Sequence, residues 1–190
     1  MKGVNIFLAD GFEDVEAVAT YDVLRRGGVD VRLIAISDDP FVISSHGLTV
    51  GVETSIADLE DSARTASDRD VMIFPGGMPG SKKLAGCRDL IKLMKSHYAA
   101  GGTLAAICAA PGLVLSQLDD LKDVEFTCFE GFQDPLIAKG AKYNPQPAIT
   151  CGRIITGRSA AHAVPFALEI LKRLKDDKTA GDVHQAMFLY

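Results

Sequence analysis

The sequence has none of the features that mark a nucleic-acid-binding, membrane-spanning or disulfide-rich protein. Its 190 residues carry a formal net charge of −5 with no basic run, which argues against nucleic acid or an anionic membrane surface as the main partner. No apolar run approaches the roughly 18 to 20 residues that a membrane-spanning helix needs. The four cysteines form no CxxC pair, a pattern that favours free thiols in a reducing compartment. We therefore expect a cytoplasmic protein.

Signals for cofactors and secretion are missing as well. Neither G-x-G-x-x-G nor a Walker pattern occurs, so Gly76-Gly77 is not a phosphate loop. The apolar run at 4–9 ends in Asp10-Gly11 and is too short for the core of a signal peptide. The histidines have no metal-ligand spacing and none adjoins a cysteine; they are His46, His97, His162 and His184. We expect no metal and no other cofactor.

The sequence does contain an alternation of buried strands and helices, which is typical of an α/β fold. Strand-length apolar runs occur at 4–9, 29–36, 71–74, 103–107 and 124–128. Helical patterns occur at 13–26, 81–85, 88–100, 160–175 and 180–186, with one more ending near Gln117. This order predicts one domain, 1–190, with a mostly parallel sheet covered on both faces. Hairpins are expected at 41–52, on the edge of that sheet, and at 147–156, with a weakly helical segment at 56–66.

Cys108 stands where a predicted strand turns sharply into a helix. The strand at 103–107 ends there, and Pro111 sits where the first helical turn tolerates proline. Free backbone N–H groups at a helix start carry partial positive charge, which favours thiolate over thiol. The layout resembles the nucleophile elbow of hydrolases, with Cys in place of Ser. Cys108 is therefore either a reactive thiol or a buried structural cysteine.

Two more loops follow predicted strands at the sheet edge where sites form in parallel sheets. The first leads to Glu16, whose neighbours on one helix stripe are apolar. Its carboxyl either points inward to share a proton with Cys108 or serves the helix N-terminus. The second loop holds Gly76 and Gly77, whose N–H groups are either ligand donors or parts of a strand-ending turn. The N–H of Ala109 is expected to be a further oxyanion donor.

In their order along the chain, these motifs resemble one family. They are DGFEDVE (10–16), YDVLRRGG (21–28), FPGG (74–77), AAICAAP (105–111) and TGR (156–158). The chain resembles the ThiJ/PfpI superfamily, specifically its DJ-one branch. The resemblance implies a flavodoxin-like three-layer α/β/α sandwich, with a mostly parallel sheet, and a homodimer. It matches Cys108 to the family's nucleophile and redox-sensitive thiol, Glu16 to its carboxyl partner, and Gly77 and Ala109 to its oxyanion donors.

The chain departs from the family pattern at several positions. Some members place a histidine where this chain has Phe129, which questions general-base turnover. Arg26 matches an arginine that some members use near the pocket, but a second arginine of their anion site is His46 here. Anion binding through His46 would depend on pH. Ala109, which follows Cys108, argues against a PfpI-type protease because that protease has histidine there, and the motifs of glutamine amidotransferases are missing.

The resemblance implies two functions of different classes. The first is a glutathione-independent glyoxalase or deglycase of the carbonyl-stress response, in which the Cys108 thiolate attacks small aldehydes, dicarbonyls or their adducts. The second is a non-catalytic redox sensor or holdase chaperone whose Cys108 is oxidised to sulfinic acid. The missing histidine favours the second function, and the predicted partnership of Glu16 with Cys108 favours the first.

Overall fold

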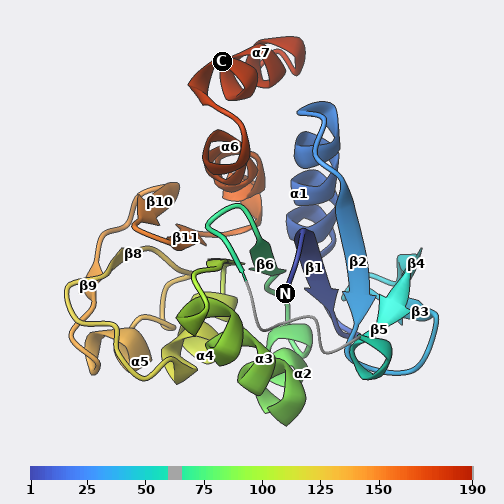
Figure 1. Ribbon diagram of the computed structural model, residues 1–190, viewed down its shortest axis with the longest axis vertical. Helices are drawn as coiled ribbons and strands as arrows, with labels where there is room; N and C mark the ends of the chain where they lie inside the picture. Colours follow the sequence, from blue (N-terminus) through green and yellow to red (C-terminus); the bar gives the residue numbers. More distant parts are fainter. Residues whose placement is uncertain (60–65, 190) are drawn as a thin grey trace.

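The computed structural model describes residues 1–59 and 66–189 and shows a three-layer α/β/α sandwich, as predicted (Figure 1). The central sheet has seven strands in the order β10-β11-β7-β6-β1-β2-β5. Neighbouring strands are parallel, except that β10 and β11 form an antiparallel hairpin. The strands are β1 (Val4–Leu8), β2 (Val31–Ala35), β5 (Thr54–Ser55), β6 (Val71–Phe74), β7 (Thr103–Ile107), β10 (Ala148–Cys151) and β11 (Ile154–Gly157).

Helices cover both faces of the sheet because side chains alternate along each strand. Ile6 and Leu8 of β1 belong to a core shared with α1 and α6, whereas Phe7 belongs to the core on the opposite face, under α2, α3 and α4 (Figure 1). Among the described residues, no helix is long and apolar enough to cross a membrane. The helices are α1 (Asp14–Arg26), α2 (Gly80–Gly86), α3 (Arg88–Ala99), α4 (Ala110–Leu113), α5 (Asp134–Ile137), α6 (Ala163–Leu174) and α7 (Asp177–Ala186).

The predicted hairpin at 41–52 is present, but as a sheet of its own. β3 (Phe41–Ile43) and β4 (Thr49–Gly51) pair antiparallel. An isolated bridge between Phe12 and Ser44 holds the hairpin beside the loop that follows β1. The edge of the main sheet is β5, which the sequence pattern did not reveal. Of the segment predicted at 56–66, Ile56–Asp58 forms a 3-10 helix, and 60–65 lie outside the described residues.

Two predicted elements are shorter than expected. The strand predicted at 124–128 is reduced to β8 (Glu125–Phe126), which pairs with β9 (Lys142–Tyr143) outside the main sheet. The next N–H groups leave the ladder, because Thr127 donates to Thr156 Oγ1 and Phe129 donates to the Cys108 carbonyl. The helix after Cys108 stops at Leu113 and continues only as a 3-10 turn, consistent with the low helix propensity of its Pro-Gly pair.

The carboxyl ends of three adjacent strands converge at one edge. β7, β6 and β1 are neighbours in the sheet, and all run in the same direction. The loops after β1 and β6 are tied together by backbone hydrogen bonds, Glu13 N–H to Gly76 O at 3.1 Å and Gly80 N–H to Gly11 O at 3.1 Å. The parallel order therefore brings residues distant in sequence to a single place, as it does in other open α/β sheets.

Candidate functional site

Cys108 occupies a sharp turn directly after β7. Its φ of +64° lies in the left-handed region that non-glycine residues rarely adopt, and such strain is worth about 1–3 kcal/mol. The turn is held from both sides, since Cys108 N–H donates to Gly157 O at 3.0 Å and its carbonyl accepts from Phe129 N–H at 2.8 Å. The structure thus contains the predicted elbow, with a half-buried thiol at its tip.

The carboxyl of Glu16 points inward toward this thiol. Glu16 lies in the first turn of α1 and is only 1% exposed. Its Oε2 accepts the N–H of Gly76 at 2.7 Å, and its Oε1 has no hydrogen-bond partner among the described residues. A buried carboxyl with one free oxygen is poorly stabilised as an anion. Of the two alternatives for Glu16, the structure supports the inward one.

Gly76 has to be a glycine because Glu16 and Cys108 meet against it. A Cβ added at Gly76 would lie 2.5 Å from Glu16 Oε2, 2.6 Å from Cys108 Cβ and 3.1 Å from Cys108 Sγ. The N–H of Gly76 is occupied by Glu16, so this residue holds the carboxyl instead of offering a free donor to a ligand. Gly77 has a φ of +91° and packs against the backbone of 11–13.

The thiol and the carboxyl shift each other's protonation. Burial, the negative charge of Glu16 and a hydrogen bond with its carboxyl raise the pKa of Cys108 to about 12, whereas the N–H groups of Ala109 and Gly77 lower it. Burial raises the pKa of Glu16 to about 7, against hydrogen bonds with Cys108 and Gly76 that lower it. The backbone N–H groups at the turn favour the thiolate, as expected, but burial and the Glu16 carboxylate raise the pKa of Cys108 by more than these groups lower it.

Glu16 and Cys108 therefore titrate as a pair. Between about pH 7 and pH 12 the pair holds one proton. The proton resides either on sulfur, leaving a carboxylate, or on Glu16, leaving a thiolate that faces the N–H groups of Gly77 and Ala109. A site with one mobile proton, a nucleophilic sulfur and two backbone donors is equipped for addition to a polarised carbonyl.

A second polar cluster lies at the N-terminus of α1. His46 Nδ1 is 2.8 Å from Asp14 Oδ2 and 3.9 Å from Glu13 Oε2, and Ser45 Oγ lies 3.3 Å from all three side chains. The hydrogen bond and charge of Asp14 raise the pKa of His46. Glu13, Asp14 and His46 have ligand atoms within 4.8 Å of one another, close enough to hold a cation, but the Asp14–His46 ion pair already accounts for their geometry.

The structure therefore gives His46 a different setting from the expected anion site. His46 faces two carboxylates, and their negative charge would repel an anion from this position. Sequence reasoning missed this cluster because Asp14 and His46 are 32 residues apart and meet only through the hairpin. Two consecutive acidic residues begin the helix just before Glu16, and they were a sequence signal from which this polar cluster could have been predicted.

Arg26 is not brought to the thiol within this chain. It ends α1, ten residues or about 15 Å of helix beyond Glu16. Its Nε donates to Asp22 Oδ2 at 2.7 Å, and it lines a cavity of about 570 Å³ against α7. The structure thus leaves Arg26 apart and brings the other predicted site residues together, with His46 at the edge of the group. These residues are Glu16, Gly76, Gly77, Cys108 and Ala109.

Phe129 lies beside the elbow through its backbone, at the position where some family members have histidine. Its side chain is 47% exposed, and its ring packs edge-on against Phe132 with centroids 6.4 Å apart. Cys128, the preceding residue, is buried in the core on the α4 face. Burial raises the pKa of the Cys128 thiol to about 12, and its side chain is fully buried.

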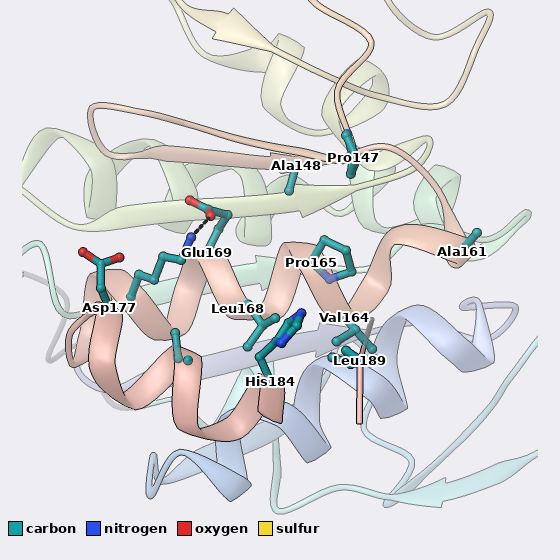
Figure 2. Close-up of a pocket in the computed structure, with 13 residues that line it drawn as sticks. Pro147, Ala148, Ala161, Val164, Pro165, Leu168, Glu169, Asp177, His184 and Leu189 are labelled. Carbon is teal, nitrogen blue, oxygen red and sulfur yellow. Dashed lines mark hydrogen bonds and ion pairs between the residues drawn. The ribbon is translucent and has the colours of Figure 1, made fainter. Parts of the chain in front are cut away.

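A larger cavity lies elsewhere and contains none of the predicted site residues. It encloses about 640 Å³ between α6, α7 and the start of β10 (Figure 2). Its walls are mostly apolar, with Pro165, Leu168 and Leu189 among them, and Lys172 is ion-paired to Glu169 at 2.6 Å. The Glu16–Cys108 pair therefore lies outside this cavity.

Comparison with known proteins identifies relatives and structural neighbours of this chain. Over 177 residues the chain is 31% identical to "Glutathione-independent glyoxalase DJR-1.2" of Caenorhabditis elegans, covering 93% of this chain and 90% of that protein. It is 32% identical to "Protein DJ-1 homolog A" of Arabidopsis thaliana over 99% of this chain, but the chain spans only 47% of that relative's length. The structure of "Toxoplasma gondii DJ-1, oxidized" superimposes with a TM-score of 0.88 at 28% identity, covering 100% of both chains.

The family model of the DJ-1/PfpI family matches residues 2–173. This match takes in every site residue discussed above, from Glu13 at the start of α1 to the turn after β11. The elbow, the inward carboxyl and the three-layer fold lie within the matched range. The chain belongs to the DJ-1/PfpI family.

Proposed function

We propose that this chain is a cysteine-dependent, glutathione-independent glyoxalase that converts small 2-oxoaldehydes into 2-hydroxy acids. The observation that carries the proposal is the buried Glu16 carboxyl, held by Gly76 N–H against the Cys108 thiol with one proton between them. The named activity of the Caenorhabditis elegans relative, which aligns over 93% of this chain, supports it.

The reaction begins with addition of sulfur to the aldehyde carbon. Cys108 forms the C–S bond, the C=O π bond breaks, and the oxygen collects negative charge in front of the N–H groups of Gly77 and Ala109. The proton of the Glu16–Cys108 pair ends on that oxygen, giving a hemithioacetal and leaving Glu16 as a carboxylate. Glu16, with a pKa near 7, is suited to give and take protons at neutral pH.

The remaining steps move one proton between adjacent carbons. The Glu16 carboxylate removes the proton on the former aldehyde carbon, forming an enediolate, and returns that proton to the neighbouring carbon, while the hydroxyl proton of the first carbon passes to the oxygen of the second. The first carbon becomes a thioester carbonyl and the second carries a hydroxyl. Water then cleaves the thioester, releasing the 2-hydroxy acid and restoring the thiol, so that the sum is one aldehyde and one water to one acid. Addition to an early glycation adduct would begin in the same way.

Purified reduced protein tests this proposal directly. Methylglyoxal consumption and lactate formation are measured without glutathione, for the wild type and for Cys108→Ser and Glu16→Gln. General acid–base groups contribute about 100- to 10,000-fold, so Glu16→Gln is expected to lose at least about 100-fold in kcat. Cys87→Ser, which changes a thiol outside the site, is the matched control. Wild-type protein that forms no lactate, or variants that match its rate, would sink the proposal.

A second candidate function is a redox sensor or holdase, favoured by the absence of histidine at Phe129. Sulfur would attack a peroxide oxygen and break the O–O bond, giving a sulfenate, and a second equivalent of peroxide would give the sulfinate. Intact mass after peroxide treatment would show two added oxygens on Cys108. Oxidation at Cys87 or Cys151 before Cys108 would exclude this candidate.

We also infer that the chain forms a homodimer in the cytoplasm. Large apolar side chains are exposed on α1 and on the β3–β4 hairpin: Val15, Val18, Phe41, Ile43 and Leu48. Exposed apolar side chains on these two elements fit contact with a second copy of the same chain. Val18→Glu is expected to convert dimer to monomer in light-scattering measurements. The cysteines described are all free, which suits a reducing compartment.

A further inference from the structure

We infer that Thr156 is a positioning residue of the Cys108 site, and that its buried hydroxyl fixes the direction of the Ala109 N–H. This inference rests on the proposed function and adds a residue to it, but it concerns the thiol itself and can be measured without turnover. Two hydrogen bonds and one peptide plane connect Thr156 to the sulfur.

The first hydrogen bond joins β11 to the segment that follows β8. Ile155 of β11 belongs to the core shared with α1 and α6, so the side chain of Thr156, the next residue, projects onto the opposite face, under α4. There its Oγ1 accepts the N–H of Thr127 at 3.0 Å, and both residues are fully buried. A buried N–H that loses its acceptor destabilises the fold, so this donor is held firmly by the hydroxyl.

This hydrogen bond sets the place of the segment along β11 more closely than packing can. Cys128, the residue after Thr127, fills the core on the α4 face, and that packing holds the backbone down on the sheet. Hydrophobic packing has little directionality, whereas a hydrogen bond depends steeply on distance and angle. The bond from Thr127 to Thr156 therefore fixes where the N–H of Phe129 points, two residues further along the segment.

The second hydrogen bond runs from this segment to the elbow. Phe129 N–H donates to the Cys108 carbonyl at 2.8 Å, and Cys108 N–H donates to Gly157 O at 3.0 Å. The elbow is strained, because Cys108 has a φ of +64°, and a strained turn persists only where its surroundings hold it. Both bonds lead back to adjacent residues of β11, Gly157 directly and Thr156 through the segment.

The peptide plane between Cys108 and Ala109 passes this restraint on to the thiol. That peptide is trans and planar, so its C=O and N–H point in opposite directions. Holding the Cys108 carbonyl toward Phe129 therefore holds the Ala109 N–H on the other side, where it lowers the pKa of Cys108. The same N–H faces the hemithioacetal oxygen in the proposed reaction. A tilt of this plane would weaken the stabilisation of both the thiolate and the oxyanion.

Removing the hydroxyl of Thr156 while keeping its shape tests the inference. Thr156→Val leaves the Thr127 N–H without its acceptor, and Thr156→Ser restores the acceptor. Thr103→Val is the matched control, because Thr103 is also fully buried, donates from Oγ1 to the Asp68 carbonyl at 2.7 Å, and begins β7, the strand that ends at Cys108. Each protein is labelled with iodoacetamide at pH 9, and the Cys108 peptide is quantified by mass spectrometry.

Thr156→Val should label more slowly than the other proteins. Weakening one hydrogen bond to a charged sulfur should lower the thiolate fraction about tenfold, and the greater nucleophilicity of a more basic sulfur should reduce this to about threefold slower labelling. Thr156→Ser and Thr103→Val should label at the wild-type rate. With methylglyoxal, kcat should fall about tenfold in Thr156→Val with KM nearly unchanged. Both valine variants should unfold at lower urea concentration than the wild type, so loss of stability alone does not predict this difference.

The outcomes separate this inference from the glyoxalase proposal. Equal labelling in Thr156→Val and Thr103→Val, or slow labelling that Thr156→Ser does not restore, would overturn the inference even if methylglyoxal were turned over. The expected labelling without lactate formation by the wild type would keep the positioning role and reject the glyoxalase.

A variant at the other end of the same connection covers the case in which Thr156→Val fails to fold. Phe129→Pro removes the N–H that holds the Cys108 carbonyl, and the side chain it replaces is exposed. Its labelling at pH 9 should also be about threefold slower. A wild-type rate in Phe129→Pro would overturn the inference.

Discussion

Replacing Glu16 by glutamine should make Cys108 more reactive toward an alkylating agent while removing turnover. A Cβ added at Gly76 would lie 2.5 Å from Glu16 Oε2 and 3.1 Å from Cys108 Sγ. The distance between Oε2 and Sγ therefore cannot exceed the sum of these two distances. A carboxylate and a thiolate about 5 Å apart repel by about 3 kcal/mol at an effective dielectric of about 20, or about 2 pKa units. Glutamine keeps the shape and removes that repulsion.

The pH dependence distinguishes the two proteins. In the wild type, alkylation should rise through about pH 7 as the pair loses its first proton, stay nearly level, and rise again toward pH 12. In Glu16→Gln the step near pH 7 should vanish, leaving one rise about 2 units below the upper wild-type step. At pH 9 the variant should therefore be alkylated more than about tenfold faster.

The assay is iodoacetamide labelling of Cys108 from pH 5 to 10, followed by peptide mass spectrometry. Glu53→Gln, a substitution on the β2 side of the sheet, controls for the loss of a carboxylate elsewhere. If Glu16→Gln retains the step near pH 7, the proton lost there is not that of Glu16. If the variant labels more slowly at pH 9, the carboxylate does not hold the proton on sulfur. Either result would refute the shared-proton account.

Three further outcomes follow from the same contacts. The pKa of Glu16 is raised from 4.5 to about 7 on folding, so its contribution to stability is present below about pH 4.5 and is lost as pH rises through 7. Glu16→Gln should therefore raise the free energy of unfolding at pH 8 by about 3 kcal/mol and leave it nearly unchanged at pH 4. Urea denaturation at the two pH values measures this difference. Gly76→Ala should lower kcat at least about 100-fold with the fold kept by circular dichroism, because its methyl group displaces Glu16 from Cys108. Asp14→Asn should lower the pKa of His46 toward its ordinary value in an NMR titration, since Asp14 is the main cause of its raised pKa.

Much of the sheet was predictable because its central strands are uninterrupted apolar runs. Residues of β1, β6 and β7 are fully buried on both faces, and a parallel strand in that position reads as a continuous hydrophobic stretch. The segment at 124–128 looks the same in sequence, yet only Glu125–Phe126 forms a strand. The N–H of Thr127 goes to Thr156 Oγ1 and that of Phe129 to Cys108, tertiary bonds that no local pattern encodes.

The sequence predicted Cys108 and the loops around it, but it also placed Arg26 at the site, where the structure does not bring it, and it did not predict the protonation. The strand-to-helix turn at Cys108 follows from local sequence signals, and the structure shows it. For Glu16 the sequence left two alternatives open, and the structure shows the inward one. The pKa values depend instead on how close the carboxyl comes to the sulfur, and Gly76 determines that approach. Likewise, the pairing of His46 with Asp14 depends on where the hairpin lies, which its own sequence does not specify.

The shared proton also explains how a thiol can serve as nucleophile beside Phe129. A carbonyl addition needs one group that takes the sulfur proton and delivers it to oxygen, and Glu16, with a pKa near 7, can do both at neutral pH. The later steps of a glyoxalase reaction move one proton between two adjacent carbons, a distance one carboxyl can serve. A histidine at 129 is therefore not needed for proton transfer. On this view Phe129→His should leave the pH profile of kcat nearly unchanged, and a new titration in that profile would contradict it.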